Sequence, residues 1–233
     1  MERLEAELTG QLIALVAHDL RNPLSALQSN VSFVASSSSM GDPERQEALD
    51  DAGISCEALA HIIDNLDVVS QFLVGRRQAS RIRISAIGVV SEVVGRFERI
   101  ARSHGGRLNI PRELLGNDIY VRSNREMLSR VLGNLVSNSI QYGGGAAIGI
   151  ALHVQDSVCL FNISDGGAPV LQELRETAFT AIGQVAAKNK GGGRYSRGLG
   201  LFAASIAADA AGATIRALEE DGHNMFEVSV PLD

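Results

Sequence analysis

Residues 18–24 of this 233-residue chain read His-Asp-Leu-Arg-Asn-Pro-Leu, and this stretch decides how the rest of the sequence is interpreted. Because His18 follows a residue of an apolar helical repeat, we expect its imidazole at the edge of the buried stripe, accessible to solvent. Asn22 lies one turn further along the same face, and Pro23 leaves the Asp19 carbonyl without its helical partner, which predicts a kink. A neutral imidazole is a competent nucleophile, and a neighbouring carboxylate can fix its tautomer. The alternative is a surface histidine on a coiled coil beside an incidental proline.

This stretch lies inside a long helical repeat, expected from Leu4 to about Ser36. Its apolar or small residues alternate in steps of four and three, at Ile13, Ala17, Leu20, Leu24, Leu27, Val31 and Val34. A second seam follows up to about Gly75, at Leu59, Ile62, Leu66, Val69 and Leu73. Heptad seams of this length require partner helices. A two-helix hairpin would leave one apolar stripe unburied, so we expect it to dimerise into a four-helix bundle.

Beyond the hairpin the pattern changes to mixed helix and strand. The polar segment 76–80 is expected to be a linker between a helical hairpin over 1–75 and an α/β sandwich over 81–233. The expected helices cover 85–103, 124–142 and 198–211, and the expected strands cover 81–84, 107–110, 146–154, 157–164, 213–219 and 224–230. The sequence therefore predicts an α+β chain of two domains.

Asparagines recur on one face of the helix expected over 124–142. Arg130, Asn134, Asn138 and Tyr142 follow one another in steps of four. Such a polar stripe can simply be the solvated face of the helix. Asparagine is nevertheless a mediocre helix former, and its carboxamide oxygen is a hard ligand suited to Mg²⁺.

Glycine-rich backbone follows in two places. Asp165-Gly166-Gly167 places an acidic residue at a tight turn after an expected strand. The run over 191–201 leads into an expected helix and lies near four basic residues, Lys188, Lys190, Arg194 and Arg197. Glycine-rich backbone at a helix N-terminus beside basic side chains favours phosphate binding.

Composition narrows the class of protein. The 27 acidic residues exceed the 21 basic ones, which argues against sequence-independent binding of nucleic acid. Two cysteines cannot build a disulfide framework, and the N-terminus is acidic where a secretory signal would be basic, so we expect a cytoplasmic location. The longest apolar stretch, over 199–208, is far shorter than the roughly 20 residues of a membrane span.

In their order along the chain, these motifs resemble the cytoplasmic core of bacterial sensor histidine kinases, from about Gln11 to Leu232. Residues 18–24 resemble the H-box of that family and residues 128–142 its N-box. Residues 165–167 are similar to the G1 box and Gly198-Leu199-Gly200-Leu201 to the G2 box.

The resemblance implies a dimerisation and histidine-phosphotransfer hairpin followed by a Bergerat-type (GHKL) ATP-binding sandwich. It implies that His18 accepts a phosphoryl group from Mg-ATP, with Asp19 orienting or deprotonating the ring, and passes it to an aspartate of a response regulator receiver domain. Asn22 would orient the attacking water in a reverse phosphatase reaction. The same resemblance implies a homodimer and a sensor input that is separate from this sequence or missing from it.

The resemblance also assigns a nucleotide site. Asn138 would coordinate Mg²⁺ with Asn134 nearby, and Asp165 would accept a hydrogen bond from the adenine amino group. Tyr142 would cover the adenine ring, and a lid between Pro169 and Arg197 would close over the phosphates. The full expected set is Asn134, Asn138, Tyr142, Asp165, Gly167, Arg197, Gly198, Leu199 and Gly200.

Three positions depart from the family pattern, and two other functions compete. Pro169 and Ser196 replace glycines of the G1 and G2 boxes, and residues 222–225 differ from the usual Gly-x-Gly-Thr. Hydrolysis of ATP by water is disfavoured, because Asn134 stands where related ATPases carry a water-activating glutamate. The remaining alternative is a histidine phosphotransferase or adaptor that relays phosphate through His18 and whose sandwich binds no nucleotide.

Overall fold

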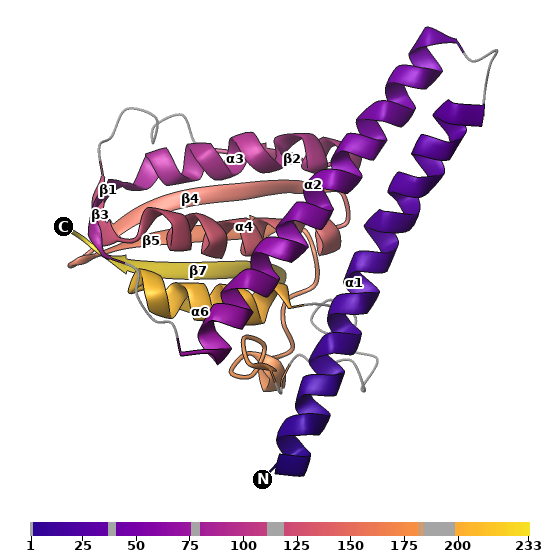
Figure 1. Ribbon diagram of the computed structural model, residues 1–233. Coiled ribbons are helices and arrows are strands. Elements are labelled where there is room, and N and C mark those ends of the chain that lie inside the picture. The colour runs from indigo at the N-terminus through magenta and orange to yellow at the C-terminus, as the bar shows by residue number, and fades with distance from the viewer. Residues whose placement is uncertain (1, 37–40, 76–79, 111–118, 182, 184–198) are drawn as a thin grey trace.

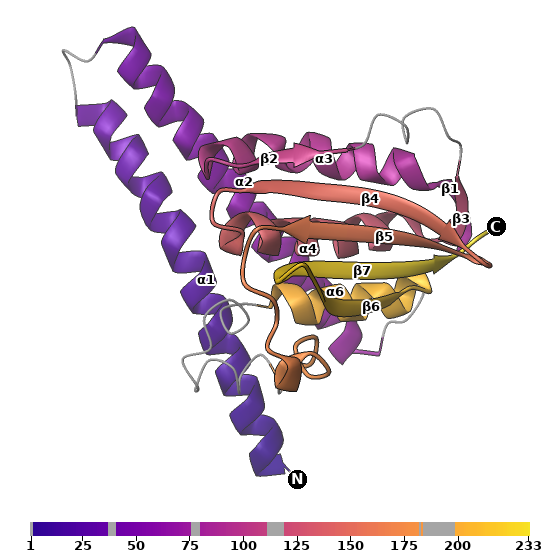
Figure 2. The same ribbon diagram turned by 180° about the vertical axis from the view of Figure 1, so that it is seen from behind.

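The computed structural model describes residues 2–36, 41–75, 80–110, 119–181, 183 and 199–233, and consists of a long helical hairpin beside an α/β sandwich (Figure 1). Helix α1 (Glu2–Ser36) continues through Pro23, and helix α2 (Asp42–Leu73) returns alongside it. In both Figure 1 and Figure 2, α2 lies between α1 and the sandwich. The predicted hairpin is therefore confirmed, and its second helix is the one that meets the sandwich.

In its described residues, the sandwich contains three long helices and two sheets. Its helices are α3 (Ala86–Ser103), α4 (Arg125–Tyr142) and α6 (Gly200–Ala211), with a short 3₁₀ turn η2 (Gln172–Leu174). Its strands are β1 (Ile82–Ser85), β2 (Arg107–Asn109), β3 (Tyr120–Ser123), β4 (Ala147–Gln155), β5 (Val158–Asp165), β6 (Thr214–Glu220) and β7 (His223–Pro231).

The main sheet has the strand order β2-β4-β5-β7-β6, with β2 parallel to β4 and the other neighbours antiparallel. Helices α3, α4 and α6 cover one face of this sheet, and Figure 2 shows the opposite face without a helix among the described elements. The covered face explains the strict alternation of buried and part-exposed residues along β5 and β7.

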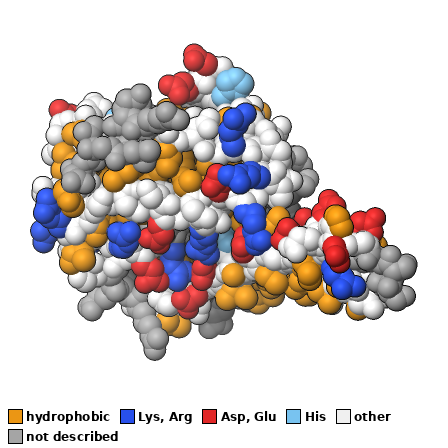
Figure 3. All heavy atoms as spheres, turned by 90° about the horizontal axis from the view of Figure 1, so that it is seen from above, with side chains coloured by type: hydrophobic (Ala, Val, Ile, Leu, Met, Phe, Trp, Pro, Cys, Tyr) orange, Lys and Arg blue, Asp and Glu red, His pale blue; other side chains and the backbone are white. Residues whose placement is uncertain are grey.

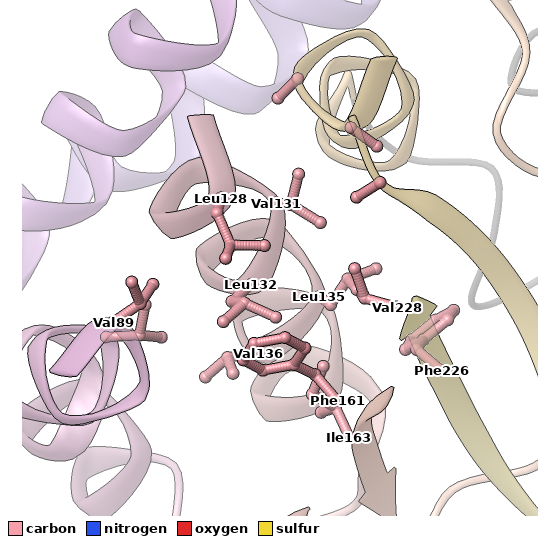
Figure 4. Close-up of a cluster of buried hydrophobic side chains, with 14 of the residues drawn as sticks. Val89, Leu128, Val131, Leu132, Leu135, Val136, Phe161, Ile163, Phe226 and Val228 are labelled. Carbon is pink, nitrogen blue, oxygen red and sulfur yellow. The ribbon is translucent and has the colours of Figure 1, made fainter. Parts of the chain in front are cut away.

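The core lies between helix α4 and the covered face of the sheet (Figure 4). Leu128, Leu132 and Leu135 of α4 point toward Phe161 of β5 and Phe226 of β7, and each of these side chains is at most 2% exposed. Packing at this density fixes the rotation of α4 about its axis, because a helix turned by one residue would bury polar side chains. The orientation of the asparagine stripe follows from this packing.

Capping residues mark the start of α4 and the end of α6. The Asn124 side chain accepts a hydrogen bond from Met127 N at 2.9 Å and caps α4. Gly212 ends α6 in the left-handed conformation (φ 74°), which an L side chain rarely adopts. These caps agree with the boundaries predicted for both helices.

Strand β3 is absent from the sequence-based prediction. It pairs antiparallel with β1, with Val121 opposite Ile84. The strand has only four residues, and its stability comes from a partner far away in sequence, so local alternation could not reveal it.

The hairpin leaves apolar side chains uncovered in the single chain. Figure 3 shows hydrophobic side chains gathered along the projecting hairpin. Exposed large residues on its two helices include Ile13, Val31, Phe33, Leu49 and Ile63. Ile13 and Val31 belong to the predicted seam of α1, whereas Phe33, Leu49 and Ile63 lie outside the predicted seams and widen the exposed apolar surface. Among the described helices, none has the length and apolar character required to cross a membrane.

Candidate functional site

His18 lies near the middle of α1 with half of its side chain exposed. The exposed fraction is 50% for His18 and 21% for Asp19, and Nδ1 of the ring lies 3.5 Å from Asp19 Oδ1. At this distance the carboxylate favours the tautomer whose proton is on Nδ1, although the hydrogen bond itself is long. The Nε2 lone pair is then left for attack on an electrophile, as the sequence predicts for a nucleophilic histidine.

Asn22 follows His18 by one helical turn and is also exposed. The two side chains therefore share a face of α1, as their spacing predicts.

Asp165, at the end of β5, is buried and held from two sides. Its Oδ1 accepts a hydrogen bond from Gly167 N at 2.8 Å, and its Oδ2 accepts one from Asn224 Nδ2 at 3.1 Å. The carboxylate is only 4% exposed. A buried carboxylate with both oxygens bonded has a fixed orientation, which is what recognition of a planar amino group requires.

Asn224 is a residue of this site that sequence reasoning missed. It is fully buried at the start of β7, and its backbone N donates to Gly167 O at 3.1 Å. Asn224 therefore joins Asp165 and the Gly167 turn into one hydrogen-bonded unit. The sequence marks residues 222–225 only as a departure from a family pattern, and the pairing of β5 with β7 is what gives Asn224 its place opposite Asp165.

The C-terminal end of α4 packs against Asp165. A Cβ on Gly143, which caps this helix, would lie 3.2 Å from the Asp165 Cβ. Tyr142, the last residue of α4, is part-buried at the same end. The structure thus brings together the end of the asparagine stripe and the buried carboxylate, as the predicted site requires.

Asn138, one turn before this end, carries an unusual carboxamide. Its Oδ1 is buried and has no hydrogen-bond partner among the described residues. A buried acceptor without a partner costs free energy, so such atoms in folded proteins call for a ligand or a functional reason. An amide oxygen is a hard donor, and the fit to a hard cation such as Mg²⁺ is therefore good.

Asn134 is bonded elsewhere. Its side chain exchanges two hydrogen bonds with Asn65 of α2, at 2.7 and 2.8 Å, and its Nδ2 also donates to Arg130 O at 3.0 Å. In this structure its amide thus faces the hairpin, whereas the sequence pattern places it with the nucleotide ligands.

The N-terminus of α6 completes this region. Leu199, its N-cap residue, is buried, and a Cβ on Gly200 would lie 3.3 Å from Asn134 Oδ1. The free N–H groups of a helix N-terminus attract anions. The expected ligands Arg197 and Gly198 lie outside the described residues, as do the basic residues at 188, 190 and 194.

Two family models match the chain. The model for the His Kinase A (phospho-acceptor) domain, HisKA, matches residues 8–71. The model for the Histidine kinase-, DNA gyrase B-, and HSP90-like ATPase, HATPase_c, matches residues 123–233. The first match contains His18, and the second contains the asparagine stripe and Asp165.

Similar proteins agree with these matches. Sensor histidine kinase WalK of Bacillus subtilis is 25% identical over 217 residues, which cover 91% of this chain and 34% of WalK. The structure of the histidine kinase AdeS of Acinetobacter baumannii is similar in fold, with a TM-score of 0.57 and 18% identity over 93% of this chain and 98% of AdeS. Histidine kinase ThkA, in complex with response regulator protein TrrA, has a TM-score of 0.53 and 19% identity over 99% of this chain and 64% of ThkA. The chain spans between about a quarter and just over half of the length of the curated relatives it matches.

Proposed function

The chain is a histidine kinase core of the HisKA plus HATPase_c type, homologous to the sensor histidine kinases of two-component signalling, and we propose that it phosphorylates its own His18 from Mg-ATP. The phosphoryl group then passes to an aspartate of a response regulator. We assign the dimerisation and phosphotransfer domain to residues 1–75, the linker to 76–80 and the ATP-binding domain to 81–233.

One observation carries the proposal: the end of α4 combines a rigid buried acceptor with an unpartnered one. Asp165 is oriented by Gly167 and Asn224, and Asn138 Oδ1 lies buried without a partner among the described residues, within five residues of the glycine that packs on Asp165. The first fits the amino group of adenine, and the second fits the magnesium ion that accompanies ATP.

Asn138 is thus the residue that we propose to hold Mg²⁺, with Tyr142 beside the adenine ring. When bound, the ion would neutralise charge on the β- and γ-phosphates. The proposed phosphate ligands are Gly198, Leu199 and Gly200 at the start of α6, together with Arg197, and the positive end of the α6 dipole supports this assignment.

The transfer to His18 needs one free ring nitrogen. With the proton on Nδ1, near Asp19, Nε2 attacks the γ-phosphorus, an N–P bond forms, and the bond to the leaving ADP oxygen breaks. The positive charge that develops on the ring is stabilised by the Asp19 carboxylate, to which the Nδ1 proton can shift. A receiver aspartate later attacks the same phosphorus, the N–P bond breaks, and the neutral imidazole returns.

We propose two partners for the hairpin. The exposed apolar residues of α1 and α2 fit a second copy of this chain, in a four-helix bundle. The exposed face around His18 fits the receiver domain, and the ThkA complex with TrrA supports a partner of this kind.

Asn22 is proposed to orient the water that hydrolyses the phosphorylated receiver. An Asn22→Ala variant should slow this dephosphorylation more than it slows labelling of His18, because it removes a water ligand and leaves the nucleophile in place. Equal losses in the two rates would contradict this role.

The direct test is to incubate the whole chain with Mg-ATP labelled on the γ-phosphate. We expect an acid-labile, alkali-stable phosphoryl group, which mass spectrometry maps to His18. Nucleotide binding without any label on a histidine would refute the kinase. Calorimetry that shows no binding of Mg-ATP at millimolar concentration would instead favour the adaptor that relays phosphate without nucleotide.

A further inference from the structure

The C-terminal half of α2 is docked on the sandwich, and a pair of amides lies at the centre of this contact. Asn65 Nδ2 donates to Asn134 Oδ1 at 2.7 Å, and Asn134 Nδ2 donates to Asn65 Oδ1 at 2.8 Å. Asn65 is 6% exposed and Asn134 is 2% exposed. Both amides are thus removed from water and bond each other twice, and Asn134 is held in addition by Arg130 O and His61.

Charged groups surround the pair. Arg96 of α3 binds the Asp64 carboxylate at 2.7 Å, and Arg130 of α4 donates to the Asp64 carbonyl oxygen at 2.8 Å. Further along α2, Arg99 of α3 pairs with Glu57. Figure 3 shows acidic and basic side chains intermingled on the face where the hairpin joins the sandwich.

Apolar contacts close the rest of the interface. Val68 and Val69 of α2 are buried in the same core cluster as the sandwich residues. Phe72 meets Phe202 of α6 edge to face, with ring centroids 6.5 Å apart. The docked face therefore resembles an interior, in which an amide that lost its partner would have no water to replace it.

The amide pair also touches the proposed nucleotide site. Asn134 lies one turn before Asn138 on α4, and its Oδ1 lies beside Gly200 at the start of α6. The Asn134 carboxamide makes two hydrogen bonds with Asn65, one with Arg130 O and one with His61, which together use its two donor and two acceptor positions. It can therefore bond a nucleotide only if one of these partners is released. Asn134 thus belongs both to the interface with α2 and to the proposed nucleotide site, and these two partners compete for its carboxamide.

Building on the proposed function, we propose that the Asn65–Asn134 pair is a latch that keeps α2 docked when no nucleotide is bound, and that nucleotide binding opens it by recruiting Asn134. Undocking would free the ATP-binding domain to move relative to the hairpin that carries His18. By linkage, the latch must lower the nucleotide affinity by the same factor by which the nucleotide weakens docking.

The test is nucleotide affinity in an Asn65→Ala variant of the full chain. Asn65 contacts Asn134 without belonging to the proposed nucleotide ligands, so the variant removes the two bonds to Asn65 and leaves those to Arg130 O and His61 in place. We expect it to bind the non-hydrolysable analogue Mg-AMPPNP about tenfold more tightly in calorimetry, on the scale of one buried hydrogen bond left unmade in the docked state. An Asn65→Leu variant keeps the side-chain volume and should show the same gain if the variant with alanine is poorly folded.

Docking is measured in a separate experiment, as the distance between two spin labels. One label is attached to the exposed Cys56 of α2 and the other to Asp156→Cys in the β4–β5 turn. Labelled chains diluted into excess unlabelled chain restrict the measured distance to one protomer. We expect a narrow distance distribution without nucleotide. A broad one is expected with Mg-AMPPNP, and also in Asn65→Ala without nucleotide.

The matched control is Gln71→Ala. Gln71 is an exposed amide on the same helix, and among the described residues its side chain donates to Asp67 of α2 at 2.7 Å. Affinity and distances should therefore stay at wild-type values. Unchanged or weaker affinity in both Asn65 variants, or a distance distribution that nucleotide leaves narrow, would overturn the latch. Absence of nucleotide binding by the wild-type chain would instead refute the proposed function.

Discussion

The surroundings of His18 and of Asp165 are built in opposite ways. His18 is half exposed on a single helix, and its contact with Asp19 is a long one of 3.5 Å. Asp165 is almost fully buried at the end of a strand, and its two oxygens are held by the Gly167 backbone of the following turn and by Asn224 of strand β7. A group that must meet both a nucleotide and a receiver domain has to remain accessible, whereas a group that recognises one planar base gains from a fixed orientation.

The largest effect is expected from a substitution of the exposed His18. A His18→Gln variant should lose phosphoryl labelling from γ-labelled ATP by at least about a thousandfold, because glutamine has no nucleophilic nitrogen. Its thermal stability should stay within a few tenths of a kcal/mol of wild type, as is usual for an exposed site. The control is His153→Gln, an exposed histidine on β4 that should leave labelling intact. Persistent label on the His18 variant would remove the proposed phosphoacceptor.

An isosteric change at Asp165 tests the other side of the comparison. In Asp165→Asn the amide NH₂ must face either Gly167 N or Asn224 Nδ2, and both of these are donors. The site therefore loses an acceptor and gains a donor–donor clash, for which we expect nucleotide affinity to fall roughly a hundredfold, or about 2.7 kcal/mol.

Calorimetry with Mg-ADP measures this loss. Asp156→Asn is the matched control, since Asp156 lies exposed in a turn at positive φ, a conformation that asparagine adopts readily. Wild-type affinity in Asp165→Asn would show that the buried carboxylate does not recognise the base.

The two regions also differ in how far the sequence predicts them. The exposure of His18 and its shared face with Asn22 follow from spacing along one helix, and the structure agrees with both. The bond from Gly167 N to Asp165 belongs to the tight turn that the sequence predicts. The bond from Asn224 could not be predicted, because Asn224 reaches Asp165 through strand pairing between residues about sixty positions apart. Local periodicity carries no information on such contacts.

Helix α4 illustrates the same limit within one element. Its boundaries are predicted correctly to within one residue, and so is the common face of its asparagines, whereas the role of Asn124 as the N-cap is seen only in the structure. The partner that each asparagine takes depends on what packs there. Asn134 meets Asn65 of the hairpin and Asn138 meets no described partner, a distinction that the four-residue spacing cannot make.

His61 of α2 allows residue type and environment to be separated, because it is an imidazole like that of His18 but is less exposed and packs where α2 meets the sandwich. Its ring packs edge to face on Phe97, with centroids 5.4 Å apart. Burial lowers the pKa of His61 from 6.5 to about 4, and the positive charges of Arg96 and Arg130 act in the same direction. Asp64 and a hydrogen bond with Asn134 oppose the shift without cancelling it.

The sign of the resulting pH dependence follows from this direction. His61 binds a proton near pH 6.5 in the unfolded chain but only near pH 4 in the folded chain. The contribution of this group to the free energy of unfolding is therefore fully present above pH 6.5 and is lost as the pH falls toward 4. Between pH 7 and 5 the free energy of unfolding should drop by about 1 to 2 kcal/mol through this one group. Urea unfolding at several pH values measures the drop, and a His61→Gln variant, which cannot ionise, should show a correspondingly flatter profile. If the free energy of unfolding of wild type and of His61→Gln varied with pH in the same way, protonation of His61 would not destabilise the folded chain. The face of α2 that carries His61 would then be open to water.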